Sequence, residues 1–339
     1  TRGRSSSAAW VDLELSGVRV VVEPVGEGVF KIIDDGAKHA FRNVIDVAVT
    51  DDGRVWAATP SRIFKLGKGG ALKAVDGGPK SIVAMDEGAD GQLLVEAGEG
   101  GWFTSDGTTW NKALLEESAS AEGSALATDG SFWGFTGDGV GRLDGDARTV
   151  YTPSEVFPKG YEAASSRGEE FGNSGSTAAT PDGAVWAGTT MSGSVSRFDE
   201  GAWQEFRPLE GEGTQRVLDL ASGDDGTVWG LIFDGSDDYL ARYDGSEWST
   251  FRWDELVDAT AKFPDEIGAV SVDGTVYLSV ADDTGNHSIM AFDGESATMI
   301  PALREDGEEA FEQLAVLPNG EVLAVADRGL YVLVPGASG

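Results

Sequence analysis

The chain has 339 residues and no cysteine, which excludes disulfides, thiolate zinc sites and cysteine nucleophiles. Its 58 acidic and 25 basic residues give a net charge of −33, which repels nucleic acid and anionic membrane surfaces. An apolar fraction of 40% is enough for a packed core, and no apolar run approaches the roughly 18 residues of a membrane span. We therefore expect a globular protein with no nucleic-acid partner and no membrane insertion.

One pattern of turns and strands recurs along the whole chain. Its clearest copy, residues 225–251, has an Asp-Gly turn, an apolar strand through Trp229, a polar loop, a strand ending at Tyr243 and a second Asp-Gly turn. An Asp-Gly pair between alternating apolar residues is a strong signal for a hairpin, because glycine readily adopts the positive φ of a tight turn. The first-turn glycines of the seven clear copies are Gly53, Gly91, Gly130, Gly183, Gly226, Gly274 and Gly320.

The spacing of these copies predicts an all-β propeller of four-stranded antiparallel blades. A weaker eighth copy begins at Ser16-Gly17, and with it the turn glycines recur at intervals of 36 to 53 residues, close to the period of propeller blades. We favour eight blades. If the segment from Trp10 to Val22 instead forms a cap outside the ring, the count is seven.

Each predicted blade must bury both of its faces against neighbouring blades. We therefore expect the Trp or Tyr that follows most first turns to pack between blades. The last copy, which ends near Val334, lacks a fourth strand, and a segment before Trp10 is expected to complete it and remove the free edge. The expected organisation is a flexible segment or closing strand over residues 1–9, one propeller domain over 10–335 and a tail over 336–339.

Two segments interrupt the repeat. Residues 153–176 read as a loop-rich insertion, and the apolar spacing over residues 253–263 permits a short helix. Insertions in repeat proteins often line the binding face, so both segments are candidates for it.

Chain direction places two kinds of loop on one face of the ring: those between the second and third strands of a blade, and those between blades. The Asp-Gly hairpins lie on the other face. Variable polar groups collect on the first face, which makes it the expected binding face. The candidate binding residues there are Arg42, Asn43, Asn173, Arg216, Asp265, Glu266, His287 and Glu312.

Converging carboxylates are also the ligands that calcium prefers. Asp282 and Asp283 are the candidate metal ligands, for Ca²⁺ or Mg²⁺. No segment has the spacing of a known calcium loop, and we expect no other cofactor. The chain has no G-x-S-x-G elbow, P-loop or H-E-x-x-H motif, so nothing nominates a nucleophile.

Two stretches carry a family resemblance. DGTVWG…LARYDGSEW and DGAVWAGT…VSRFDEGAW resemble the two-component regulator propeller repeats and, more loosely, the streptogramin lyase repeats. The resemblance covers most of the chain and implies an extracytoplasmic sensor or ligand-binding domain beside a membrane. The lyase repeats also imply a catalytic histidine with a metal-bound acidic cluster. Only one plausible histidine, His287, is present here, so no catalytic residue is carried over.

The resulting hypothesis is a monomeric, non-catalytic binding or sensing module outside the cytoplasm. Its acidic, loop-built face around the central channel would bind a small molecule, a carbohydrate or a protein. The alternative is a lyase or lactonase that depends on a divalent cation and has its site at the channel mouth. A third possibility is a structural interaction hub with a plugged channel.

Overall fold

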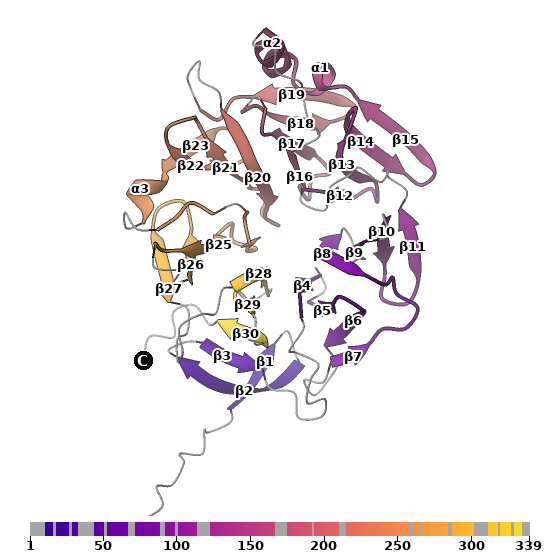
Figure 1. Cartoon of the computed structure of the whole chain (residues 1–339), viewed down its shortest axis with the longest axis vertical. Coiled ribbons are helices and arrows are strands. Elements are labelled where there is room, and N and C mark those ends of the chain that lie inside the picture. The colour runs from indigo at the N-terminus through magenta and orange to yellow at the C-terminus, as the bar shows by residue number, and fades with distance from the viewer. Residues whose placement is uncertain are drawn as a thin grey trace, which may run out of the picture.

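The computed structural model shows a closed ring of sheets around a central opening (Figure 1). It describes residues 11–333 except for 16–17, 27–28, 33–43, 51–52, 67–71, 89–91, 99–100, 114–122, 167–174, 192, 210–214, 258–260, 265, 284–286, 302–310, 318 and 327–328. No helix of these described segments is long and apolar enough to cross a membrane.

Six blades are four-stranded antiparallel sheets whose strands follow one another in sequence from the inside of the ring outward. The first three, in chain order, are β4 (Asp46–Val49), β5 (Val55–Thr59), β6 (Arg62–Leu66) and β7 (Leu72–Ala74); β8 (Ile82–Gly88), β9 (Gln92–Ala97), β10 (Gly101–Ser105) and β11 (Trp110–Ala113); and β12 (Ala125–Leu126), β13 (Phe132–Thr136), β14 (Gly139–Asp144) and β15 (Ala147–Tyr151).

The next three blades repeat this plan. They are β16 (Gly175–Ala179), β17 (Val185–Thr189), β18 (Val195–Asp199) and β19 (Ala202–Phe206); β20 (Arg216–Ser222), β21 (Val228–Phe233), β22 (Asp238–Tyr243) and β23 (Trp248–Arg252); and β24 (Ala269–Val270), β25 (Val276–Ala281), β26 (His287–Phe292) and β27 (Ala297–Pro301).

The seventh blade joins the two ends of the chain. From the inside outward it contains β28 (Phe311–Val316), β29 (Val322–Ala326) and β30 (Gly329–Leu333), followed by β3 (Val29–Ile32), β2 (Val18–Gly26) and β1 (Val11–Leu15). Strand β3 pairs with β30 antiparallel, with Phe30 opposite Val332. This closing strand lies further along the chain than the segment before Trp10 from which we expected it.

The described part of the chain therefore forms seven blades, and the favoured count of eight is wrong. The weak repeat at Ser16-Gly17 has the hairpin alternation of a blade because β1, β2 and β3 form an antiparallel meander. That meander extends the outer side of the seventh sheet and contributes no inner strand to the ring. A hairpin pattern in the sequence does not distinguish these two placements.

The repeated Asp-Gly pairs form the predicted turns. Gly226, in the turn between β20 and β21, has a φ of +82°, and Gly245, in the turn between β22 and β23, has a φ of +98°. In the second kind of turn the aspartate also holds the loop together. The Asp244 carboxylate accepts hydrogen bonds from the N–H groups of Ser246 (2.8 Å) and Glu247 (3.0 Å).

The hydrophobic core lies between blades, as the repeated aromatic residues predict. Trp56, Trp133, Trp186 and Trp229 occupy matching positions on the second strand of their blades and are almost completely buried. Each packs toward the next blade: the ring centroid of Trp186, for example, lies 4.8 Å from that of Tyr243. These stacked interfaces stabilise the ring because a single four-stranded sheet could not bury its own faces.

The two interruptions of the repeat contain short helices. The insertion predicted over residues 153–176 begins with α1 (Pro153–Val156) and α2 (Pro158–Ser166), at the outer edge of the ring (Figure 1). Glu205 of β19 accepts the N–H groups of Lys159 and Gly160 at 2.8 and 2.9 Å, which docks α2 onto the fourth blade. The helix predicted within residues 253–263 is α3 (Trp253–Leu256).

Candidate functional site: the central channel

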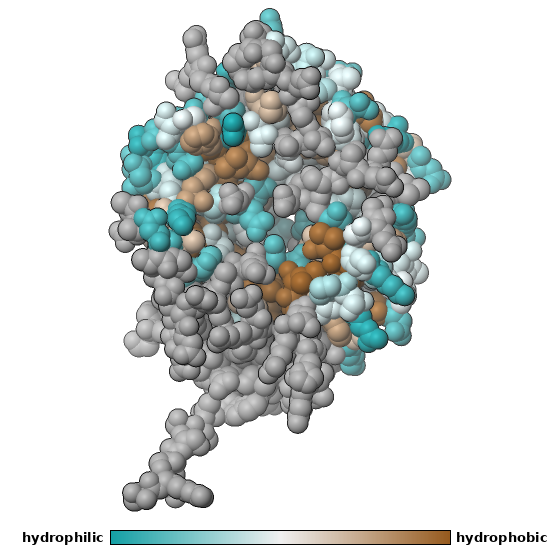
Figure 2. Space-filling view, in the orientation of Figure 1, coloured by the Kyte–Doolittle hydropathy of each residue, from teal (hydrophilic) through white to brown (hydrophobic). Residues whose placement is uncertain are grey.

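The inner strands of all seven blades enclose a cavity of about 1030 Å³. Residues of β4, β8, β12, β16, β20, β24 and β28 line it. In the space-filling view the centre of the ring is a hollow bordered by both hydrophilic and hydrophobic residues (Figure 2). This volume is in the range of small-molecule sites, which usually combine an apolar wall with a few placed polar groups.

Small residues keep the channel open. Ala48, Ala84, Gly123, Ala221 and Gly268 are among the lining residues of five different blades. Larger side chains at the half-buried Ala84 and Ala221 would reduce the open volume, whereas a Cβ at Gly123 or Gly268 would meet Ser176 or Leu314 of the neighbouring blade. The described wall is therefore shaped as a cavity and not as a packed core.

The polar part of the wall is acidic. The described lining residues include five carboxylates and no lysine, arginine or histidine. Glu266 stands just before the inner strand β24, and Asp224 follows the inner strand β20, so the two lie toward opposite ends of the channel. The five carboxylates are those of Asp46, Asp86, Asp219, Asp224 and Glu266.

Two of these carboxylates occupy the same position of the repeat and connect neighbouring blades. Asp219 accepts the hydroxyl of Ser176 at 2.7 Å and the N–H of Ile267 at 2.8 Å, which links the fourth, fifth and sixth blades. Asp46 accepts the N–H of Met85 at 2.6 Å, which links the first and second blades. Both side chains therefore fix the inner strands that form the channel wall.

Asp46 is buried in this wall, with 5% of its surface exposed. Burial raises the pKa of its carboxyl well above the usual range, although hydrogen bonds from the N–H groups of Met85 and Val47 oppose the shift. The negative charges of Asp86 and Glu266 raise this pKa further. The three carboxyl groups thus share one electrostatic environment on the channel wall.

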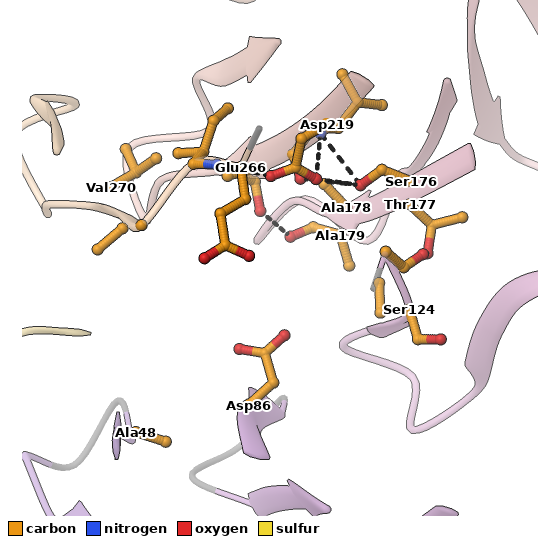
Figure 3. Close-up of a pocket in the computed structure, with 18 of the residues that line it drawn as sticks. Ala48, Asp86, Ser124, Ser176, Thr177, Ala178, Ala179, Asp219, Glu266 and Val270 are labelled. Atoms are coloured by element: carbon orange, nitrogen blue, oxygen red, sulfur yellow. Dashed lines mark hydrogen bonds between the residues drawn. The ribbon is translucent and has the colours of Figure 1, made fainter. Parts of the chain in front are cut away.

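Asp86 and Glu266 face each other across the channel. The Asp86 carboxylate extends from β8 and the Glu266 carboxylate from the loop before β24, and the two point toward one another (Figure 3). Both side chains are exposed to the channel. The Nε2 of Gln313 lies 3.5 Å from Oε1 of Glu266. Two carboxylates that meet from opposite walls define a position for a positively charged group between them.

An apolar part of the wall lies beside these acids. Met85 and Trp102 of the second blade and Leu126 of the third also line the cavity. Trp102 is on the third strand of its blade, unlike the repeated tryptophans, and its ring centroid lies 5.1 Å from that of Phe132. All three side chains are buried in the contacts between blades, so they support the channel wall and expose little apolar surface to it.

Of the predicted binding residues, Glu266 is the one that the structure places among the described lining residues. Arg216 begins β20 and is exposed, and His287 begins β26 and is half-buried; neither lines the cavity. Glu312 lies on β28, although its side chain is outside the description. Arg42, Asn43, Asn173 and Asp265 lie outside the described residues.

The two predicted metal ligands lie away from the channel. Asp282 forms an isolated bridge with Ala261 after β25, and Asp283 is exposed beside it. Within the described segments, no three residues of His, Asp and Glu lie close enough together to hold a metal ion. A role for Asp282 and Asp283 in binding Ca²⁺ or Mg²⁺ remains a prediction.

Sequence reasoning missed Asp46, Asp86 and Asp219 because it searched the loops and not the inner strands, and it missed Asp224 because that residue lies at an Asp-Gly turn on the other face. A usable signal was present for two of them. Asp46 stands seven residues before the turn glycine Gly53, and Asp219 stands seven residues before Gly226. An aspartate repeated at one position of an otherwise apolar inner strand indicates a polar group on the channel wall.

Comparisons with known proteins place this fold. Neither a family model nor a curated protein sequence matches the chain. Virginiamycin B lyase from Staphylococcus aureus, solved as an inactive variant with quinupristin, matches with a TM-score of 0.59 and 13% identity over 90% of this chain and 98% of that one. YCF48 from Cyanidioschyzon merolae matches with a TM-score of 0.59 and 12% identity over 88% and 98%.

The extracellular domain of a hybrid two-component system from B. thetaiotaomicron is also similar. It matches with a TM-score of 0.57 and 14% identity over 96% of this chain, which spans 50% of that domain's chain. The resemblance seen in the repeats therefore holds for the fold: this chain is a propeller similar to both streptogramin lyases and extracellular sensor domains. At these identities the similarity defines the architecture alone.

Proposed function

We propose that the chain is a non-catalytic binding module of the sensor type, which takes its ligand into the central channel. The observation that carries this proposal is the cavity of about 1030 Å³ enclosed by the inner strands. A pocket of this size is built on strands that neighbouring blades hold in place. Such a rigid site reduces the ordering cost of binding.

The chemistry of the wall favours binding over catalysis. Its described polar groups are carboxylates, hydroxyls and the amide of Gln313, several of which bond the neighbouring backbone. A general acid or base needs a partner that orients it toward a reacting group, and His287, which we considered for that role, is not among the described lining residues. The similarity to extracellular sensor domains supports an extracytoplasmic location.

The lyase alternative rests on the similarity to virginiamycin B lyase. It predicts that the ligand is consumed and that a divalent cation is required. Measuring whether a bound compound is recovered chemically unchanged, with and without Mg²⁺, separates the two functions. Turnover that depends on the cation would replace the binding proposal by the lyase.

The binding proposal is tested with a ligand panel and a variant that fills the channel. Thermal shift is measured against oligosaccharides, amines, carboxylic acids, short peptides and divalent cations. Ala221→Trp places a large side chain on the wall at β20, and Ala202→Trp places the same side chain on the outer strand β19 as the matched control. We expect a ligand that stabilises the native chain and Ala202→Trp but not Ala221→Trp. If no class of ligand binds, or if Ala221→Trp binds equally well, the proposal fails.

A further inference from the structure

The acidic groups of the channel identify the class of ligand. We propose that the central channel binds an organic cation, held by a protonated amine or guanidinium between Asp86 and Glu266. This inference rests on the proposed function, because it names the ligand chemistry of the same cavity.

The first step of the argument is the position of the charges. Asp86 and Glu266 come from the second and sixth blades, both line the cavity, and their carboxylates point toward one another (Figure 3). Asp46, 5% exposed on the wall, lies within the electrostatic reach of both. The negative charges of Asp86 and Glu266 repel each other, and a cation between the two carboxylates removes that repulsion.

The second step is the number of carboxylates that come together, which fits an organic cation better than a metal ion. A divalent metal needs several oxygens within about 2.6 Å, whereas no three of the described His, Asp and Glu side chains form such a group. An ammonium or guanidinium group has several N–H donors and can bond carboxylates that stand further apart. Asp86 and Glu266, on opposite walls, suit the larger cation.

The third step is the size and lining of the cavity. Its half-buried apolar residues, which include Leu218, Val270 and Val316, can contact the carbon skeleton of a ligand. The cavity volume is far larger than a bare ion needs and accommodates a ligand with a carbon skeleton.

The experiment uses spermidine as the cationic probe and 1,8-octanediol as a neutral chain of similar length. Binding is measured by calorimetry at about 0.15 M salt, where the Debye length of about 8 Å screens attraction to the general surface charge. We expect spermidine to bind and octanediol not to bind. Asp86→Asn and Glu266→Gln each remove one charge from the pair, and each is expected to weaken spermidine binding by about tenfold.

Glu162→Gln is the matched control, because it removes one exposed negative charge from α2, which lies at the outer edge of the ring. Unchanged unfolding midpoints show that the variants are folded. The inference is overturned if Glu162→Gln weakens binding as much as Glu266→Gln, which indicates surface attraction, or if Ca²⁺ binds at the pair and spermidine does not. If an uncharged saccharide binds in a channel-dependent way while spermidine fails, this inference falls and the proposed function stands.

Discussion

The guanidinium of Arg197 lies over the indole ring of Trp186, 5.9 Å from the ring centroid. The same guanidinium bonds Asp182 of the first turn and Asp199 of the second turn, each at 2.8 Å. One arginine on the third strand thus ties both Asp-Gly turns to the buried tryptophan. The third blade repeats the arrangement, with Arg142 5.4 Å from the Trp133 ring.

This arrangement predicts a modest loss of stability when the arginine is removed. Arg197→Met keeps an apolar stem over Trp186 but loses the charge, so both ion pairs and the cation–π contact disappear. Because Asp182 and Asp199 are both more than a third exposed, we expect a loss of only about 1 kcal/mol in the free energy of unfolding. Urea denaturation measures it, with Arg207→Met at an exposed site as the control; equal effects of the two variants would contradict the structural role.

The junction of β3 with β30 predicts how the ring responds to shortening at its N-terminus. Removing residues 1–15 deletes the edge strand β1 and leaves the closing strand in place. Removing residues 1–32 deletes β3 and exposes the edge of β30 to solvent. We expect the shorter deletion to have a small effect and the longer one to lower the unfolding midpoint strongly and to promote association through the open edge.

Size-exclusion chromatography and thermal unfolding of both deletions give the readout. If the deletion of residues 1–32 leaves a monomer as stable as the deletion of residues 1–15, then β3 does not close the ring.

The second turn of the fifth blade predicts an unusually acidic side chain. The Asp244 carboxylate accepts the N–H of Glu247 and the N–H and hydroxyl of Ser246, and these hydrogen bonds lower its pKa to about 2. A carboxyl with a lowered folded pKa contributes stability above its unfolded pKa of about 3.9, and this contribution is lost as the pH falls toward 2. Carboxyl NMR titration should give a midpoint for Asp244 near that value, and Ser246→Ala should raise it. A midpoint near 3.9 in the native chain would rule out these hydrogen bonds.

The sequence predicts the architecture well because the repeated elements encode it locally. An Asp-Gly turn such as that at Gly226 and a tryptophan such as Trp229 need only a few neighbouring residues to be recognised. Blade count is different, because it depends on which strand pairs with which. The hairpin of β1 and β2 has the same alternation whether it begins a blade or extends one, and only the pairing of β3 with β30 decides between them.

The candidate site was harder to predict for the same reason. Glu266 was found because it stands in a loop between blades, where functional groups are expected. Asp86 lies within the strand β8. It faces Glu266 only because the closed ring places the second and sixth blades on different sides of one cavity. No local pattern in the sequence encodes a distance between two blades that are far apart in the chain.

Asp46 predicts a pH dependence of opposite sign to that of Asp244. Burial and the nearby carboxylates raise its folded pKa well above the unfolded value, so its contribution to stability is fully present below about pH 3.9 and is lost as the pH rises through the folded pKa. Asp46→Asn removes this titration. The native chain therefore loses stability as the pH rises and the variant does not. We expect the free energy of unfolding of Asp46→Asn to increase relative to that of the native chain between pH 4 and 8, by up to about 1.4 kcal/mol for each unit of pKa shift.

Urea denaturation across that pH range gives the comparison. Asparagine offers one acceptor where the carboxyl offers two, so the hydrogen bonds from Val47 and Met85 cannot both be kept and a constant loss of stability is expected at every pH. The informative quantity is therefore the change of the difference with pH. Glu162→Gln, at an exposed site on α2, serves as the control for the removal of one acidic group. If the difference in the free energy of unfolding between Asp46→Asn and the native chain stays constant from pH 4 to 8, Asp46 does not titrate abnormally. If the variant instead loses stability relative to the native chain as the pH rises, a cation lies beside Asp46.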